Sequence, residues 1–95
     1  MLNDIEASQN FFLQCFVIHN IPLTFEQFRK RIGLKIKYYR NLRDYTQAHL
    51  GEMVKCDETY ISQIENGHKN ISLKMVHKIA EALNVNAAKL FDVED

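Results

Sequence analysis

The sequence predicts an all-α domain, for three reasons. Apolar residues recur every three or four positions along most of the chain, which is the spacing of one helix face. Residues that favour helix N-caps, such as Ser, Thr and Asp, come just before several of these apolar runs. No segment alternates apolar and polar residues for long enough to indicate a strand. With 95 residues, nearly half of them apolar, the chain can build one core but not two.

Residues 1–24 differ in composition from the rest of the chain. The apolar run from Phe11 to Leu23 is interrupted by polar residues and is too short to cross a bilayer. No Lys or Arg precedes Arg29, so the basic start of a secretory signal is missing. We expect an N-terminal helical extension with two alternative roles. It either contacts a second copy or a partner protein, or it packs on its own domain over Leu34 and Tyr38.

A long helix is predicted from about residue 25 to 43. Thr24 and Gln27 have the spacing of a capping box, which starts the helix. Gly33 inside it indicates either close packing against a neighbour or a bend between two shorter helices. The predicted core face consists of Phe25, Phe28, Ile32, Ile36, Tyr39 and Leu42. Of the adjacent Tyr38 and Tyr39, helix spacing favours one in the core and one at the surface.

Two short helices follow, each with one narrow apolar stripe. The first runs from Gln47 to Val54 after the N-cap Thr46, and the second from about Glu58 to Glu65 after the N-cap Asp57. The first buries Leu50 and Val54, and the second buries Tyr60, Ile61 and Ile64. Asn66-Gly67 ends the second helix because both residues tolerate positive φ.

The last predicted elements are a helix over about 72–83 and a final turn. Ser72 caps the helix and Asn84 stops it, while Asn86 caps a turn that ends at Leu90-Phe91. The core face of the helix consists of Leu73, Val76, Ile79, Ala80 and Leu83.

Two short helices joined by a tight turn are the ingredients of a helix-turn-helix. A second helix that is polar outside its apolar stripe suits entry into the major groove of DNA. The charge distribution agrees, because residues 29–80 hold eleven Lys or Arg against five acids, a balance of +6, although the whole chain is neutral. A solvated surface with ordinary charge scatter is the alternative, and it holds equally for the run Arg29–Arg31.

The run TQAHLGEMVKCDETYISQIENG, from Thr46 to Gly67, resembles the helix-turn-helix of lambda-type phage repressors and the related Xre-like bacterial regulators. The resemblance covers about Ile32 to Phe91 and includes the closing stretch SLKMVHKIAEALNVNAAKLF. It implies a compact five-helix lambda-repressor-like domain over residues 25–95, with the N-terminal segment added. It also implies a cytoplasmic regulator, encoded by a bacterium or a phage, that binds double-stranded DNA.

The resemblance also implies a set of DNA contacts. Positions that face bases, or flank those that do, are Glu58, Thr59, Tyr60, Ser62 and Gln63. Positions along the phosphate path are Gln47, Arg40, Asn66, Lys69 and Asn70, where the alternative for Lys69 is a simple solvent-facing side chain. Arg40 and Glu65 match a pair that forms a partly buried salt bridge in some relatives.

Two residues depart from the family pattern. Gly51 stands where the family usually has Ala, which changes the closeness of helix packing and weakens a helix by up to about 1 kcal/mol. Lys55 stands where the turn usually has Gly, so either a side chain accepts positive φ or the turn takes another shape.

Three functions are compatible with these features. The first is a sequence-specific regulator, most often a repressor, that binds an inverted-repeat operator as a homodimer. The second is an antitoxin that holds a toxin at its N-terminal segment and also binds DNA. The third is a restriction-modification controller protein, a special case of the first.

An enzyme is not expected, because the sequence shows no nucleophile–base constellation and no phosphate loop. The four histidines have no metal-ligand spacing with each other or with Cys15 and Cys56, so we expect neither a metal nor a cofactor. The two cysteines also lack CxxC spacing, which fits a reducing cytoplasm.

Overall fold

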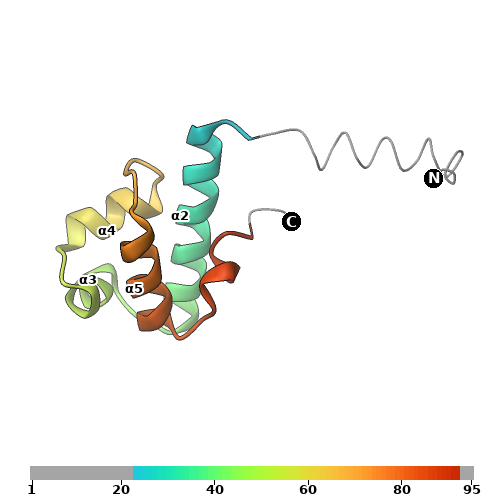
Figure 1. The fold of residues 1–95 in the computed structure, drawn as a ribbon. Helices are drawn as coiled ribbons and strands as arrows, with labels where there is room; N and C mark the ends of the chain where they lie inside the picture. The colour runs from blue at the N-terminus through green and yellow to red at the C-terminus, as the bar shows by residue number, and fades with distance from the viewer. Residues whose placement is uncertain (1–22, 93–95) are drawn as a thin grey trace, which may run out of the picture.

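A computed structural model describes residues 23–92, and Figure 1 shows its elements. Within that range there are four α-helices, one 3-10 turn and no strand, which confirms the all-α prediction. The elements are α2 (Phe25–Leu42), α3 (Gln47–Val54), α4 (Glu58–Glu65), α5 (Leu73–Leu83) and η1 (Ala87–Lys89). The expected N-terminal helical segment lies outside the described residues, apart from its last two positions.

The predicted N-caps start the helices. The Thr24 hydroxyl accepts from the backbone N–H of Gln27 at 3.1 Å, and the Gln27 side chain accepts from the N–H of Thr24 at 2.9 Å, so the capping box is complete. Single caps of the same kind occur at Thr46, Asp57 and Ser72, each accepting from the N–H three residues later. Local hydrogen bonding therefore sets where each helix begins.

The helix ends also follow the predicted residue types. Asn84 ends α5 in the left-handed region at φ 57°, and Gly67 follows α4 at φ 76°. Lys55 ends α3 with φ 65°, so the turn keeps a left-handed residue although a side chain is present. Lys55, Cys56 and Asp57 alone connect α3 to α4, which fits the expected helix-turn-helix.

The helices enclose one core. In Figure 1, α2 runs the length of the domain, and α5 lies beside it, with α3 and α4 on the other side of α5. Both α3 and α2 contact α4 and α5. The buried apolar side chains are Ile32, Ile36, Leu50, Val54, Ile61, Ile64, Val76, Ile79, Ala80, Leu83 and Leu90.

The predicted core faces were wrong at the helix ends. Phe25 is 60 % exposed, Leu42 55 % and Leu73 77 %, although all three fit the apolar periodicity. Phe25 and Leu73 are the first residues of α2 and α5, and Leu42 is the last residue of α2. Periodicity continues to the tip of a helix, whereas burial stops where the neighbouring helices end. Tyr38 is exposed and Tyr39 half-buried, as predicted.

Gly33 is explained by close packing and not by a bend. A Cβ at this position would clash with the carbonyl oxygen of Ile64 and lie 2.6 Å from that of Glu65, so the backbone of α2 touches the end of α4. The helix continues through Gly33 without interruption over 18 residues. Gly51 is in the same situation, because its Cβ would lie 2.6 Å from the carbonyl oxygen of Cys56.

Residues 23–92 form four α-helices and not the five predicted for residues 25–95, because the last element is a single 3-10 turn. The Asn86 side chain accepts from the N–H of Ala88 at 2.9 Å and starts the turn as expected. The turn holds only three residues, and the Leu90 side chain that follows it is fully buried in the core. Among the helices of residues 23–92, none has the length and apolar character to span a membrane.

Candidate nucleic-acid interface

The outer face of α4 is polar and its inner face is apolar. Glu58 and Thr59 are exposed, and Ser62 and Gln63 are half-buried. These four residues follow one another at helical positions i, i+1, i+4 and i+5, so they share one side of the helix. Ile61 and Ile64 point the other way, into the core. Tyr60 is half-buried at the border between the two faces, although the sequence placed it in the buried stripe.

A buried ion pair joins α2 to α4. Arg40 Nε donates to Glu65 Oε2 at 2.6 Å, and Arg40 Nη2 donates to Glu65 Oε1 at 3.0 Å. Only 8 % of Arg40 and 3 % of Glu65 is exposed. The structure therefore contains the pair expected between these residues, in a two-pronged geometry that sets both side chains in one orientation.

The same pair extends to α3. Gln47 Nε2 donates to Glu65 Oε1 at 3.0 Å, and Arg40 Nη1 donates to the carbonyl oxygen of Tyr45 at 2.7 Å. The carboxylate of Glu65 thus accepts three hydrogen bonds from two helices. Gln47 is the first residue of α3, so this network fixes the start of that helix against the end of α4. Because a buried ion pair adds little net stability over apolar residues, its main effect here is geometric.

The loop after α4 carries the remaining expected phosphate contacts. Asn66 and Asn70 are exposed and Lys69 is half-buried, with its Nζ 5.7 Å from the centre of the Tyr60 ring. The loop thus brings an ammonium group to the edge of α4. The role of Lys69 in phosphate binding stays a prediction.

Arg29 is a residue of this region that sequence reasoning did not place. Its Nη1 donates to Asn70 Oδ1 at 2.7 Å, which ties the first turns of α2 to the loop after α4. The sequence showed only that Arg29 belongs to a basic run. No signal in the sequence could join residues 41 positions apart.

A second structural arginine was also missed. Arg43 Nε donates to the carbonyl oxygen of Leu83 at 2.7 Å, and its Nη2 donates to that of Asn84 at 3.2 Å. These bonds satisfy the last carbonyls of α5, where a cation is favoured by the helix dipole.

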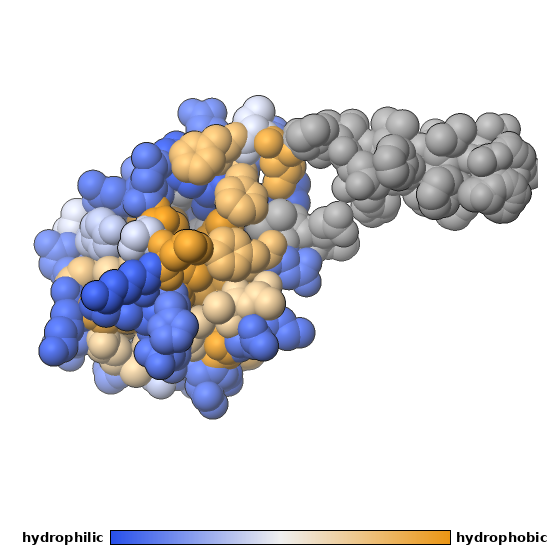
Figure 2. All heavy atoms as spheres, in the orientation of Figure 1, coloured by the Kyte–Doolittle hydropathy of each residue, from blue (hydrophilic) through white to orange (hydrophobic). Residues whose placement is uncertain are grey.

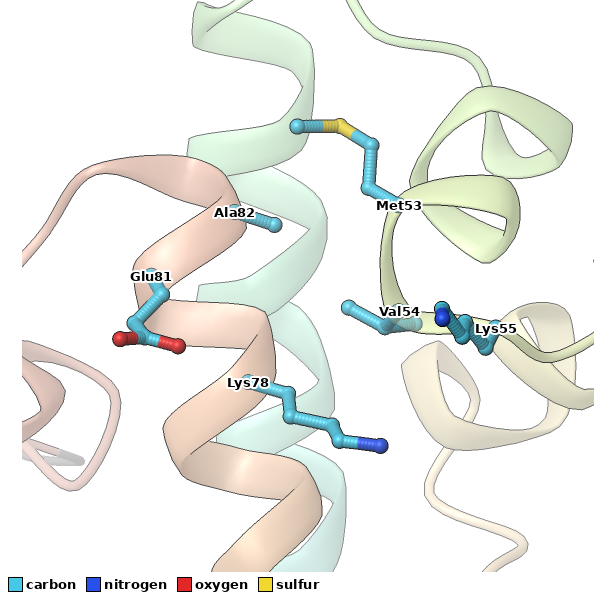
Figure 3. A pocket seen from close by; sticks show the side chains of 6 residues that line it. All are labelled: Met53, Val54, Lys55, Lys78, Glu81 and Ala82. Atoms are coloured by element: carbon cyan, nitrogen blue, oxygen red, sulfur yellow. The ribbon is translucent and has the colours of Figure 1, made fainter.

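A shallow pocket of about 460 Å³ lies between the end of α3 and α5 (Figure 3). Its lining consists of Met53, Val54, Lys55, Lys78, Glu81 and Ala82.

The Cys56 thiol lies in the turn between α3 and α4. Burial raises the pKa of this thiol, and the neighbouring Asp57 carboxylate raises it further, although Lys78 acts in the opposite direction. The thiol therefore stays protonated at neutral pH, which is unlike an activated nucleophile. The part of the chain that the structure describes contains no cluster of three metal-ligating side chains.

Comparison with known proteins agrees with this geometry. Residues 36–90 match the HTH_3 helix-turn-helix family, and the chain belongs to this family. Control protein C.MunI from a Mycoplasma species is 38 % identical over 66 residues, which is 67 % of this chain and 89 % of that protein. The HTH-type transcriptional regulator MJ0272 of Methanocaldococcus jannaschii is 38 % identical over 64 % of this chain and 92 % of that protein.

A crystal structure gives the same result for the fold. The restriction-modification controller protein C.AhdI from Aeromonas hydrophila superimposes with a TM-score of 0.63 at 27 % identity, over 65 % of this chain and 94 % of that one. The relatives are thus helix-turn-helix transcriptional regulators and restriction-modification controller proteins. The function class of this chain is accordingly that of a DNA-binding regulator.

Proposed function

We propose that this protein is a sequence-specific regulator of transcription that inserts α4 into the major groove of double-stranded DNA. The observation that carries the proposal is the polar outer face of α4, held on a rigid support by the buried Arg40–Glu65–Gln47 network. Rigid support matters because a side chain recognises a base only when its polar atoms are held at hydrogen-bonding distance from the edge of that base.

Four side chains of α4 are assigned to base edges. The Gln63 amide matches the two-pronged donor and acceptor pattern of adenine, and the Glu58 carboxylate accepts from the cytosine amine. A good pair of this kind discriminates against a wrong base by about 1–3 kcal/mol. The hydroxyls of Thr59 and Ser62 lie on the same side of the helix and complete the set. Tyr60 is assigned a flanking role, because its ring already lies under Lys69.

The phosphate contacts flank α4 on two sides. On one side, Gln47 and the free N–H groups at the start of α3 are directed to the backbone, which suits the positive end of a helix. On the other side are Asn66, Lys69 and Asn70 in the loop after α4. Arg40 is assigned an indirect role, since all of its nitrogens already donate inside the protein and it is only 8 % exposed.

We propose that the protein represses a promoter by binding an inverted repeat as a homodimer. The proposed location is the cytoplasm of a bacterium or a phage host. Two copies of α4 related by a twofold axis would reach major-groove segments one helical turn apart. The controller-protein relatives favour a more specific second candidate, control of a restriction-modification operon. The antitoxin alternative, with a toxin bound at residues 1–24, stays a prediction.

Selection of bound duplexes from a random DNA pool, followed by sequencing, tests the proposal. We expect enrichment of an inverted repeat whose half-sites lie about ten base pairs apart. Enrichment of a single unrepeated site would contradict the dimer but not the regulator. A folded protein that enriches no sequence would contradict sequence-specific binding altogether.

Two variants of the interface distinguish base contacts from phosphate contacts. Gln63→Ala should relax the base preference at one position of each half-site. Lys69→Ala should weaken binding to all sequences alike and reduce the slope of log affinity against log salt by about 1. Binding isotherms on the selected site and on single-base variants measure both effects. Equal weakening on every duplex by both variants would show that α4 is placed wrongly.

A further inference from the structure

One side of the domain exposes a connected group of apolar side chains. Phe25 is 60 % exposed, Leu73 77 % and Phe91 36 %, and Figure 2 shows apolar side chains gathered on this side of the domain. The residues line a groove of about 190 Å³ between the start of α2, the start of α5 and the end of η1. We call this the apolar groove; its walls are Phe25, Phe28, Ile32, Ile71, Leu73, Val76 and Phe91, with Arg29 and Asn70 at the rim.

The walls of the apolar groove are already held in place. The rings of Phe28 and Phe91 stack with centroids 6.5 Å apart, and the guanidinium of Arg29 lies 5.0 Å from the centre of the Phe25 ring. Arg29 is in turn bonded to Asn70. The groove is thus a formed surface with an apolar floor, and such exposed patches mark contact sites.

We propose that the apolar groove is the docking site for residues 11–22 of its own chain. The first argument is continuity, because the segment ends at Pro22, three positions before Phe25 in the groove wall. Each extended residue spans about 3.3–3.6 Å, so a segment that begins only a few residues before Phe25 is long enough to lie along the groove. The face differs from the one expected from the sequence, over Leu34 and Tyr38.

Composition gives the second argument. Seven of the twelve residues from 11 to 22 are large and apolar: Phe11, Phe12, Leu13, Phe16, Val17, Ile18 and Ile21. The same twelve residues contain no Asp, Glu, Lys or Arg. An uncharged, largely apolar segment therefore matches the apolar walls of the groove.

Docking has a consequence for the rest of the domain. A segment in the groove covers Phe25 and so encloses the neighbouring Arg29, whose guanidinium holds Asn70. It therefore steadies the loop after α4 through the bond from Arg29 to Asn70. The docking itself does not depend on the proposed function, and its test uses no DNA.

Cross-linking in the full-length chain tests the proposal, because the segment contains a natural cysteine, Cys15. Cys56 is first replaced by Ser, and Leu73→Cys then places a thiol on the groove. The matched control is Met53→Cys, a 42 % exposed apolar residue in the pocket between α3 and α5. A short bis-maleimide is added to dilute protein, and the linked peptides are identified by mass spectrometry.

We expect a link between residues 15 and 73 within one chain, with a yield roughly tenfold above the link between 15 and 53, because docking raises the effective concentration of the two thiols. Links between 15 and 73 of two different chains would overturn the proposal and assign the groove to a second copy. Equal yields for the two cysteines would overturn it as well. Unchanged helical circular dichroism confirms that each variant is folded.

Proteolysis gives an independent measurement that needs no cysteine at position 73. Chymotrypsin cuts after Phe, and residues 11–22 contain Phe11, Phe12 and Phe16. Leu73→Glu should speed cleavage at these sites severalfold, since a charge in the groove opposes an apolar segment, while Met53→Glu should leave the rate unchanged. Equal cleavage rates in both variants and the natural chain would contradict docking.

Discussion

The α3–α4 side of the domain and the apolar groove differ in which side chains are buried and which are exposed. On the α3–α4 side a charged pair is buried with its hydrogen bonds made, Ile61 and Ile64 of α4 reach the core, and the outer face of α4 is polar. In the groove, large apolar side chains such as Phe25 and Leu73 are exposed. The polar α3–α4 side needs no further segment to satisfy its side chains, and it suits a polar ligand such as DNA. The exposed apolar side chains of the groove are typical of a surface that another segment covers.

The largest expected effect comes from breaking the buried pair. Glu65→Ala leaves the Arg40 guanidinium buried without its anion, which should lower the free energy of unfolding by about 3–5 kcal/mol. Urea denaturation measures the loss. Glu52→Ala is the matched control, because Glu52 is an exposed acid on α3, and it should change stability by less than about 0.5 kcal/mol. Similar small losses in both variants would show that the network does not hold the α3–α4 side together.

A smaller effect is expected where two backbones touch. Gly33→Ala puts a methyl group against the carbonyls of Ile64 and Glu65, and overpacking of this kind costs about 1–3 kcal/mol. Helix propensity alone predicts the opposite sign, a gain of up to about 1 kcal/mol. Denaturation of this variant beside Leu34→Ala, at an exposed neighbour, measures the difference. A more stable Gly33→Ala protein would show that α2 and α4 separate at little cost.

The smallest effect concerns the turn between α3 and α4. Lys55 holds a left-handed conformation at φ 65°, so Lys55→Gly should raise stability by up to about 0.5 kcal/mol, the relief of strain being partly offset by a more flexible unfolded chain. Asn84→Gly is the control at φ 57°, where Asn already tolerates the conformation and no gain is expected. Thermal unfolding of both variants measures the contrast. A loss of stability in Lys55→Gly would mean that the side chain itself holds the turn.

Local sequence determined the beginning and end of each helix. The caps Thr24, Thr46, Asp57 and Ser72 hydrogen-bond within three residues of themselves, so their effect is visible in a short window of sequence. Asn84 and Gly67 end helices for an equally local reason, their tolerance of positive φ. The polar face of α4 and the helix-turn-helix spacing are likewise properties of consecutive residues, so the sequence alone shows the resemblance to the family.

Other features depend on tertiary contacts between residues that are far apart in the sequence. The choice between packing and bending at Gly33 depended on carbonyls more than thirty positions away, and the bond from Arg29 to Asn70 joins residues 41 apart. The exposure of Leu73 also escaped prediction, because periodicity marks a helix face but not where its neighbours stop. Capping and turn energies act between near neighbours in the chain, whereas burial and close contact depend on the three-dimensional arrangement of whole helices.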